Sequence, residues 1–330
     1  MEYVAAIIFF FGKLFHPWPV FEIALGLLTL LNLRNFKKIN NPYFLIFIIY
    51  TLITGRFYNY SSFLYWLRLT CLLSFFVIPP VFSQKYKHFF LLIVSANLIF
   101  GLIQYFIWPN FTYFNALNWD PHLFRLISTF LDPTFTGLLY LMFLIVLFCH
   151  KLPFYYLILP YVTMSLTYSR SSLLAFLASF AYLAKKLNKP KIFYISSLLL
   201  LITLVALPRR EGEGTKLERL SSVRAKIENY QEGITLFKQH PILGVGYNNL
   251  KHVRNLDNNL SHSSSGFDGS LLTILTTTGL IGFSFFILGW YHYFRQTDLL
   301  HQTLLAAIFI HSLFSNSLLY PFVLFFLISV

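Results

Sequence analysis

The longest polar stretch of the chain, residues 209–267, contains two arginines and two histidines that could do chemistry: Arg219, Arg224, His240 and His262. An arginine guanidinium is always charged and can bind an anionic group through two parallel hydrogen bonds. A histidine can accept a proton near neutral pH. We therefore expect an active site to involve this stretch, and the surrounding elements must explain how it is positioned.

The composition indicates an integral membrane protein that crosses the membrane several times. The 330 residues are 57% hydrophobic and only 11% charged, whereas about 25% of an ordinary soluble domain is charged. The apolar runs are longer than the roughly ten-residue alternating strands of an outer-membrane barrel, which predicts helices. The net charge of +13 comes without a continuous basic face or stacking motif, so no nucleic-acid partner is expected.

Twelve apolar runs are candidate membrane spans, so we expect an all-α polytopic protein with about twelve transmembrane helices, forming a single domain over residues 1–330. The runs cover residues 3–15, 17–33, 42–55, 61–82, 88–108, 134–149, 153–168, 171–184, 192–208, 268–294, 299–315 and 317–330. The loop at 209–267 then lies between the ninth and tenth spans, and we expect it to contain short helices.

Strict alternation of the spans places most basic connectors on one side. The eleven basic residues on that side are Arg34, Lys37, Lys38, Lys85, Lys87, Lys151, Lys185, Lys186, Lys189, Lys191 and Arg295. The positive-inside rule assigns this side to the cytoplasm, so both termini are expected there, in a bacterial inner membrane. The loop at 209–267 is then periplasmic, together with the connector at 109–133 and the Ser169–Arg170 turn. ATP is absent outside the bacterial inner membrane, and no phosphate-binding glycine-rich loop is present in the sequence. A reaction on that face therefore needs a pre-activated substrate or an ion gradient.

Two charged residues fall inside predicted spans at a similar depth, Glu22 and Arg68. Charged side chains are costly within a membrane, and we expect these two to form an ion pair, with contact of Arg68 to a lipid diphosphate as the alternative. Cys71 and Cys149 also lie in apolar runs, where they are expected to be packed small side chains and not part of a disulfide or metal cluster.

Four short motifs occur in order along the chain. The first begins at Arg125 and reads Arg-Leu-Ile-Ser-Thr-Phe-Leu-Asp-Pro-Thr, and the second is Ser-Arg-Ser-Ser at 169–172. The third combines the loop arginines with a predicted amphipathic helix at 227–237, which carries Tyr230 and leads to His-Pro-Ile-Leu-Gly-Val-Gly at 240–246. The fourth joins His262 to the span that contains Thr-Thr-Thr-Gly at 276–279.

Together, over about residues 120–320, these motifs resemble the superfamily of lipid A core O-antigen ligases and O-antigen polymerases. The sequence departs from the family pattern at three positions: Ser128 replaces a glycine, Thr134 an asparagine, and Ser263 the asparagine that follows the histidine. The resemblance implies a fold like that of the C-type glycosyltransferases. It also implies transfer of a glycan from undecaprenyl diphosphate to an acceptor hydroxyl, with inversion at the anomeric carbon.

The resemblance also assigns roles to residues. His262 is expected to be the general base, and Arg224 and Arg170 to stabilise the charge of the departing diphosphate. Arg219, Arg125, Arg68 and Tyr230 are expected to bind the diphosphate or the glycan; the motif does not decide whether Arg219 or Arg224 is the family's loop arginine. Neither a metal nor another cofactor is expected.

Two other functions stay open. A polymerase would use the same donor and add the glycan to a growing chain, whereas a ligase uses the lipid A core as acceptor; a protein oligosaccharyltransferase would share the chemistry. A transporter or flippase of a lipid-linked sugar belongs to another class and would show related halves with broken helices in corresponding positions. The expected partners are the lipid-linked glycan, its acceptor and membrane lipids.

Overall fold

The computed structural model describes residues 1–15, 19–33, 39–55, 60–117, 121–254 and 266–330. Over these residues the chain is helical, apart from two short antiparallel strands in which Asn110 faces Leu123 and Phe111 faces His122. The elements are α1 (Glu2–Phe11), α2 (Val20–Leu33), α3 (Pro42–Thr54), α4 (Tyr60–Val77), α5 (Gln84–Ile107), β1 (Asn110–Phe111), η1 (Thr112–Leu117), β2 (His122–Leu123), η2 (Ser128–Phe130), α6 (Pro133–Cys149), α7 (Tyr155–Ser165), α8 (Arg170–Lys186), α9 (Pro190–Ala206), η3 (Glu213–Thr215), α10 (Ser221–Gln239), α11 (Leu250–Val253), α12 (Ser270–Gln296), α13 (Leu299–Ser312), η5 (Ser317–Leu319) and α14 (Pro321–Ser329).

Each of the twelve predicted apolar runs coincides with one helix, α1 to α9 and α12 to α14. Among the described residues, three helices are long and apolar enough to cross a membrane: α4, α5 and α12. Several others are apolar but have only 10–17 residues, fewer than the roughly 20 needed to span a hydrocarbon core. The helical class of a membrane protein is therefore supported, whereas the count of twelve transmembrane helices is not confirmed.

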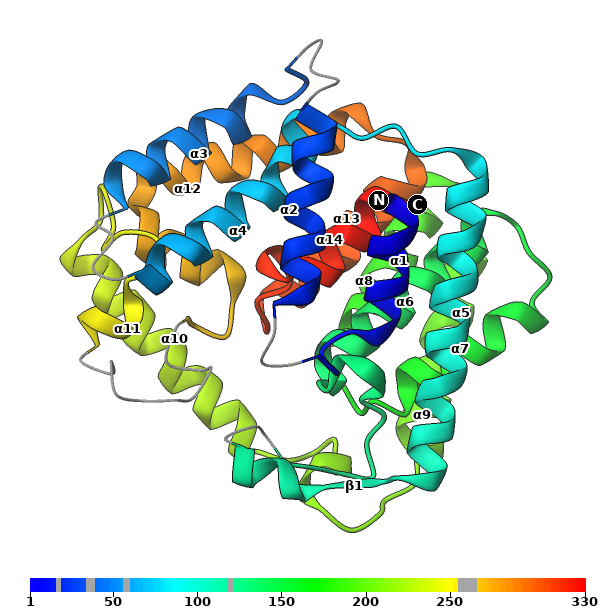
Figure 1. Ribbon diagram of the computed structural model, residues 1–330. Coiled ribbons are helices and arrows are strands. Elements are labelled where there is room, and N and C mark those ends of the chain that lie inside the picture. The colour runs from blue at the N-terminus through cyan, green and yellow to red at the C-terminus, as the bar shows by residue number, and fades with distance from the viewer. Residues whose placement is uncertain (16–18, 34–38, 56–59, 118–120, 255–265) are drawn as a thin grey trace.

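The helix ends meet in two groups. At one end, which we call the terminal end, Lys87 Nζ donates to Val330 O, and Tyr182 OH donates to Gln302 Oε1. At the other, which we call the loop end, Lys13 N donates to Thr129 O and Leu126 N to Leu166 O. The two chain termini lie close together in Figure 1, and Val330 at the C-terminus belongs to the terminal end.

The core is built around α6 and α14. Nearly every residue of α14 and of α6 from Thr136 to Leu147 is buried, which is the pattern of a helix surrounded by other helices. Aromatic rings from α1, α5 and α14 pack edge to face beside α6, with Phe9 between Phe90 and Phe322. Phe130, in the segment that leads into α6, packs on Phe9 and Phe322, so the same cluster fixes the start of α6 at the loop end.

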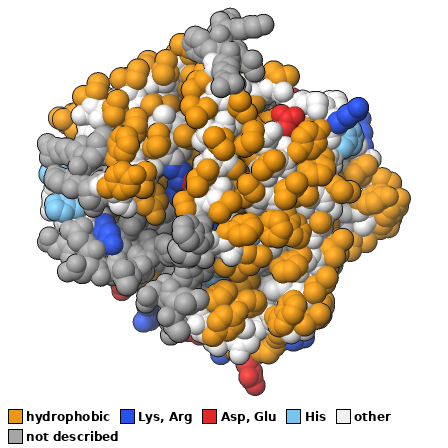
Figure 2. Space-filling model, viewed as in Figure 1, with side chains coloured by type: hydrophobic (Ala, Val, Ile, Leu, Met, Phe, Trp, Pro, Cys, Tyr) orange, Lys and Arg blue, Asp and Glu red, His pale blue; other side chains and the backbone are white. Residues whose placement is uncertain are grey.

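The outer surface is largely apolar. Figure 2 shows hydrophobic side chains across the face formed by α1, α2, α4 and α5, with most of the charged side chains toward its rims. Fully or largely exposed Ile53, Phe106 and Val205 illustrate that this apolar cover continues over several helices. A surface of this kind suits a lipid environment. A cavity of about 410 Å³, lined by residues such as Leu28, Ile78 and Phe82, opens at the terminal end and contains no predicted site residue.

Candidate functional site

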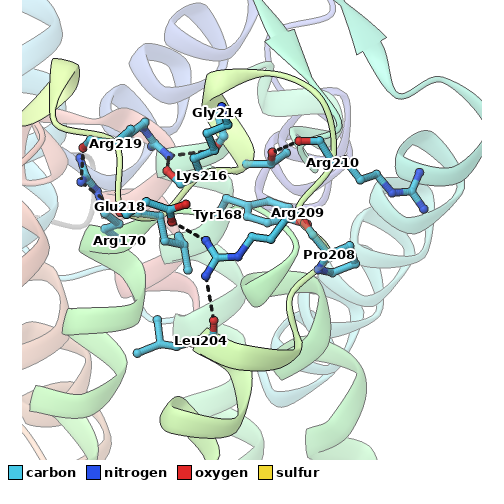
Figure 3. A network of polar contacts seen from close by, with 12 residues as sticks. Tyr168, Arg170, Leu204, Pro208, Arg209, Arg210, Gly214, Lys216, Glu218 and Arg219 are labelled. Carbon is cyan, nitrogen blue, oxygen red and sulfur yellow. Dashed lines mark hydrogen bonds and ion pairs between the residues drawn. The ribbon is translucent and has the colours of Figure 1, made fainter.

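The predicted site residues that the structure describes lie at or toward the loop end, on segments that come from distant parts of the chain. The Ser169–Arg170 turn meets the segment at 208–219, which follows α9 (Figure 3). Arg125 contacts both, since it donates to Thr167 O and packs against Gly214. The start of α10 follows directly. The loop end thus combines three of the four sequence motifs in one region.

Arg170 connects the start of α8 to this loop segment. Ser169 caps the helix by accepting a hydrogen bond from Ser172 N. The Arg170 guanidinium then donates to two backbone carbonyls, Leu217 O at 3.3 Å and Arg219 O at 3.0 Å, and to Ser222 Oγ at 2.6 Å. Arg170 therefore fixes the path of the loop into α10, in addition to any role toward a substrate.

Arg219 lies beside Arg170 and is held in the same way. Its Nη1 donates to Gly214 O at 2.8 Å and to Lys216 O at 3.0 Å. Burial lowers the pKa of Arg219 from its usual value, and the neighbouring charge of Arg170 lowers it further. Both side chains are half-buried and both carry a positive charge, so an anion that binds nearby would be attracted by both.

Arg224 is placed differently. It is exposed on α10, and its guanidinium has no hydrogen-bond or ion-pair partner among the residues that the structure describes. The charge of Arg170 acts on Arg219, whose pKa it lowers.

Two more arginines in this region were not singled out from the sequence. Arg209 pairs with Glu218 at 2.5 Å and also donates to Leu204 O, which ties the loop to the end of α9 (Figure 3). The Arg210 guanidinium lies 5.2 Å from the centre of the Phe124 ring. Their position directly after a span is the signal that could have identified them, because loop residues next to a helix end are fixed by that helix.

Arg125 is buried, with 8% of its surface exposed, and its Nε donates to Thr167 O at 3.0 Å. Gly214 lies against its side chain, since a Cβ there would come within 2.7 Å of Arg125 Cδ. Burial, followed by the positive charge of Arg125, lowers the pKa of His122 to about 4. Arg125 therefore packs between two turns, and His122 beside it is neutral at neutral pH.

Ser128 stands where the family pattern has a glycine, and its backbone conformation is one that glycine adopts easily. Ser128 has φ 49°, in the left-handed region that glycine occupies at little cost. Its Oγ donates to Asn97 O and to Asn97 Oδ1, both at 3.1 Å. These hydrogen bonds offset part of the cost of a serine in a glycine conformation. Asp132 then caps α6 by accepting from Thr134 N and Phe135 N.

The third and fourth motifs form one backbone unit. Helix α12 is broken at Gly279, which has φ 63° and ψ −170°, and the turn at 241–246 fills the break. The hydrogen bonds are Val245 N to Thr276 O (3.1 Å), Gly246 N to Thr277 O (2.8 Å), Leu280 N to Pro241 O (2.9 Å) and Ile281 N to Ile242 O (3.4 Å). Tyr50 OH donates to Thr278 O at 2.9 Å. A broken helix at membrane depth requires partners of this kind for its freed backbone groups.

Glycines make this close approach possible. A Cβ on Gly279 would overlap the Ile242 carbonyl, and a Cβ on Gly244, which has φ 70°, would overlap the backbone at Thr277. The sequence indicated that Gly244 and Gly279 belong to motifs, but nothing in their spacing showed that the two motifs touch.

His262 lies outside the described residues, so its geometry is not part of this structure. The chain after it is anchored at Phe267 and Asp268: Asn316 Nδ2 donates to Phe267 O at 2.6 Å, and Asp268 N donates to Asn229 Oδ1 at 2.7 Å. Lys226 Nζ on α10 pairs with the Asp268 carboxylate at 3.3 Å. Asp268, directly before α12, is therefore attached to α10.

Tyr230 also attaches α10. Its hydroxyl donates to Leu313 O, and its ring lies against Gly269, so that a Cβ there would come within 2.5 Å of the hydroxyl. Burial raises the pKa of Tyr230, and the charge of Asp268 raises it further. These contacts give Tyr230 a structural role, and sugar binding would have to use the part of the ring that stays exposed.

The expected ion pair between Arg68 and Glu22 is present at 3.5 Å, and both side chains are partly exposed. The Arg68 guanidinium also lies 4.8 Å from the centre of the Tyr65 ring. Nearby, Lys13 Nζ lies 5.4 Å from the centre of the Tyr320 ring. The two cysteines are free and half-buried.

His311 was missed by the sequence reasoning. It is fully buried at the end of α13, where Ser317 Oγ donates to Nδ1 at 2.5 Å and Nε2 donates to Thr134 O at 3.2 Å. The carbonyl can only accept, which assigns the proton to Nε2. Ser171 Oγ lies 3.1 Å from the same nitrogen. His311 thus joins the starts of α6 and α8, and a histidine inside a predicted span was the signal that could have identified it.

Residues 155–287 match the family model described as O-antigen ligase. The matched segment includes the Ser169–Arg170 turn, both loop arginines and the turn that fills the break in α12. No curated protein matches the chain. The match confirms, over residues 155–287, the resemblance of this chain to the O-antigen ligase superfamily.

Proposed function

We propose that the chain is a membrane glycosyltransferase that moves a glycan from undecaprenyl diphosphate to the lipid A core oligosaccharide. The observation that carries the proposal is that the Arg170 guanidinium binds the backbone carbonyl of Arg219, while the Arg219 guanidinium is held by Gly214 O and is affected by the charge of Arg170. Both residues lie within the segment that matches the O-antigen ligase family. A diphosphate is strongly anionic, and two fixed arginines can bind it and stabilise the charge that develops as it leaves.

The proposed reaction is a single displacement. An acceptor hydroxyl oxygen attacks the anomeric carbon, the bond from that carbon to the diphosphate oxygen breaks, and His262 takes the hydroxyl proton. Attack opposite the leaving group inverts the anomeric configuration. Undecaprenyl diphosphate departs with its charge stabilised by Arg170 and Arg219, and Arg224 contributes from the exposed face of α10. The charge is balanced by side chains, so the reaction needs no metal.

The remaining predicted residues have supporting roles in this proposal. Arg125 is buried and bound to Thr167 O, so it shapes the site from beneath. Arg68 is paired with Glu22 but partly exposed, and can approach a diphosphate from the side of α4. Tyr230 contacts the glycan with the exposed edge of its ring, because its hydroxyl is bound to Leu313 O.

We place the site on the periplasmic face of the bacterial inner membrane, with both termini in the cytoplasm. Basic residues in short connectors support this orientation, because Lys87, Lys151 and Lys186 lie at or near helix ends of the terminal group. The loop end then faces the periplasm, where the lipid-linked glycan would be found.

A polymerase is the second candidate, because the same arginine pair would serve the same donor with a growing glycan as acceptor. For a transporter, the break in α12 is the one favourable feature. However, the break leaves backbone carbonyl and N–H groups of α12 without partners in the helix, and four of these groups form hydrogen bonds with the 241–246 turn. The break is therefore filled by protein and does not present free helix ends to a substrate.

The test is glycan transfer in reconstituted membranes that contain a lipid-diphosphate-linked oligosaccharide and lipid A core together, with EDTA present. We expect product on the lipid A core for the wild type, and none for His262→Ala or Arg219→Ala. Arg209→Gln is the matched control, because it removes a neighbouring arginine whose guanidinium pairs with Glu218. Elongated carrier-linked glycan would identify a polymerase, and movement of the carrier without any transfer would refute the enzyme.

A further inference from the structure

Helix α10 carries two apolar faces, and only one of them is covered by the protein. The covered face includes Tyr230, Gly233 and Leu236, and packs on the start of α12, where Gly233 lets the Leu272 side chain approach closely. The second face consists of Leu220, Val223, Ile227 and Ile234, which we call the α10 stripe. Spacings of three, four and seven residues place these four side chains on one side of a helix.

The α10 stripe is exposed. Leu220 is 65%, Ile227 53% and Ile234 44% accessible, and the helix lies at the periphery of the molecule (Figure 1). A surface helix of a soluble protein has one apolar face, against the core, and polar residues elsewhere. A row of exposed aliphatic side chains beside the covered face therefore needs a partner.

Exposed aliphatic side chains continue beyond α10 onto α12, a helix that is long and apolar enough to cross a membrane. Directly after α10, Ile242 and Leu243 are exposed as well. Backbone hydrogen bonds hold this turn against Leu280 and Ile281 of α12, whose side chains are also exposed. Exposed aliphatic side chains are thus present along α10, through the turn and onto α12, which is one of the three helices long and apolar enough to span.

A basic and two acidic residues of α10 lie at different positions relative to the stripe, in a distribution that fits a membrane surface. Lys238 is four residues after Ile234 and so borders the stripe. The acidic side chains Glu228 and Glu232 lie on a different side of the helix, and Glu232 binds Arg254 through two hydrogen bonds, at 2.6 and 2.7 Å. A basic residue beside an apolar stripe, with acidic residues turned away, is the distribution found in helices that lie on anionic lipid surfaces.

We propose that α10 is an interfacial helix, whose stripe at Leu220, Val223, Ile227 and Ile234 is buried in the lipid leaflet at the loop end. The occupant of this face is lipid and not a second protein chain, because the stripe is continuous with the apolar surface of α12. The loop therefore rests on the membrane along α10 and does not extend freely into solvent.

One consequence rests on the proposed function. A helix at this depth lies at the level of lipid headgroups, where the diphosphate of a lipid-linked donor must also lie. Arg219 and Ser222, at the start of α10, are then held at that depth through their bonds to Arg170.

The test measures the surroundings of single nitroxide labels on the full-length protein in vesicles of phosphatidylethanolamine and phosphatidylglycerol. Cys71 and Cys149 are first replaced by serine. Labels are then attached at Ile227→Cys and Ile234→Cys in the stripe, with Glu228→Cys and Thr235→Cys as matched controls one residue further along. All four positions are exposed, so the substitutions should leave folding intact. Electron paramagnetic resonance compares collisions with oxygen, which concentrates in lipid, and with a water-soluble nickel chelate.

We expect labels at positions 227 and 234 to collide more often with oxygen, and labels at 228 and 235 to collide more often with the nickel chelate. Dominance of the chelate at all four positions would mean that α10 lies in water, and would overturn the proposal. Protection from both reagents at 227 and 234 would mean that a protein surface, such as a second copy, covers the stripe, and would overturn it equally. Because the measurement involves no glycan transfer, its outcome is independent of whether the proposed enzyme activity is correct.

Discussion

The substitution Gly279→Ala tests the union of the broken helix with the 241–246 turn. Gly279 has φ 63° and ψ −170°, a conformation that is open almost only to glycine, and placing another residue there costs about 1–3 kcal/mol. The new Cβ would also overlap the Ile242 carbonyl, so the turn must move. Loss of even two of the four backbone hydrogen bonds adds about 1 kcal/mol each. We expect a total destabilisation of about 3–5 kcal/mol.

The matched control is Gly26→Ala in α2, where a Cβ meets nothing within 4 Å. Replacing a helical glycine with alanine in open space stabilises a helix by about 0.5–1 kcal/mol, so the two alanine variants should shift stability in opposite directions. The assay compares the unfolding midpoints of both variants with the wild type in the same detergent, and the rate at which protease cleaves the chain between residues 239 and 250. If the unfolding midpoint of Gly279→Ala equals that of Gly26→Ala, and protease does not cleave its 241–246 turn faster than in the wild type, the reasoning is refuted.

Three further predictions concern single side chains at the loop end. Arg219→Lys should lower kcat/KM for glycan transfer by tenfold or more, because lysine keeps the charge but not the planar fork; a variant with wild-type kcat/KM would contradict the proposed anion pair. The pKa of His122 is lowered to about 4, so between pH 6.5 and 4 the unfolded chain binds a proton that the folded chain does not. Stability should therefore fall by up to about 3 kcal/mol as the pH drops through this window, and His122→Gln should abolish that part of the pH dependence in denaturation curves. Tyr230→Phe should lose about 1 kcal/mol of stability with the hydrogen bond to Leu313 O, and should retain transfer activity if the ring, not the hydroxyl, contacts the glycan.

The helices were largely predictable from the sequence, and the differences at their ends have local causes. The first run was predicted to reach residue 15, but α1 ends at Phe11 because Gly12 adopts φ 55°. Helix α5 begins at Gln84, earlier than predicted, because Ser83 caps a first turn whose residues are polar and basic. The predicted amphipathic helix at 227–237 is present, and α10 extends beyond it at both ends.

Contacts between distant segments were less predictable. The partners of Arg170 are mostly backbone carbonyls, and a carbonyl carries no information about which side chain will bind it. The break in α12 also could not be located from hydropathy, because Thr278 and Gly279 occur within a continuous apolar run. The turn at 241–246 supplies the missing hydrogen-bond partners, and this compensates for the backbone groups that the break leaves unpaired within the helix.

The structure also assigns different roles to residues that belong to the same set of motifs. Gly244 and Gly279 act through the backbone, by allowing two segments to touch, and Arg125 is buried against Thr167 O. Arg170 holds the loop through three hydrogen bonds, and Arg219 lies beside it with its charge only partly shielded by carbonyls. Substitution of the first group should therefore change stability together with activity, whereas substitution of Arg219 should change activity with a smaller effect on stability. If the proposed function is correct, Arg219, and not the most deeply buried arginine, is therefore the position where binding of an anionic donor can be measured separately from folding.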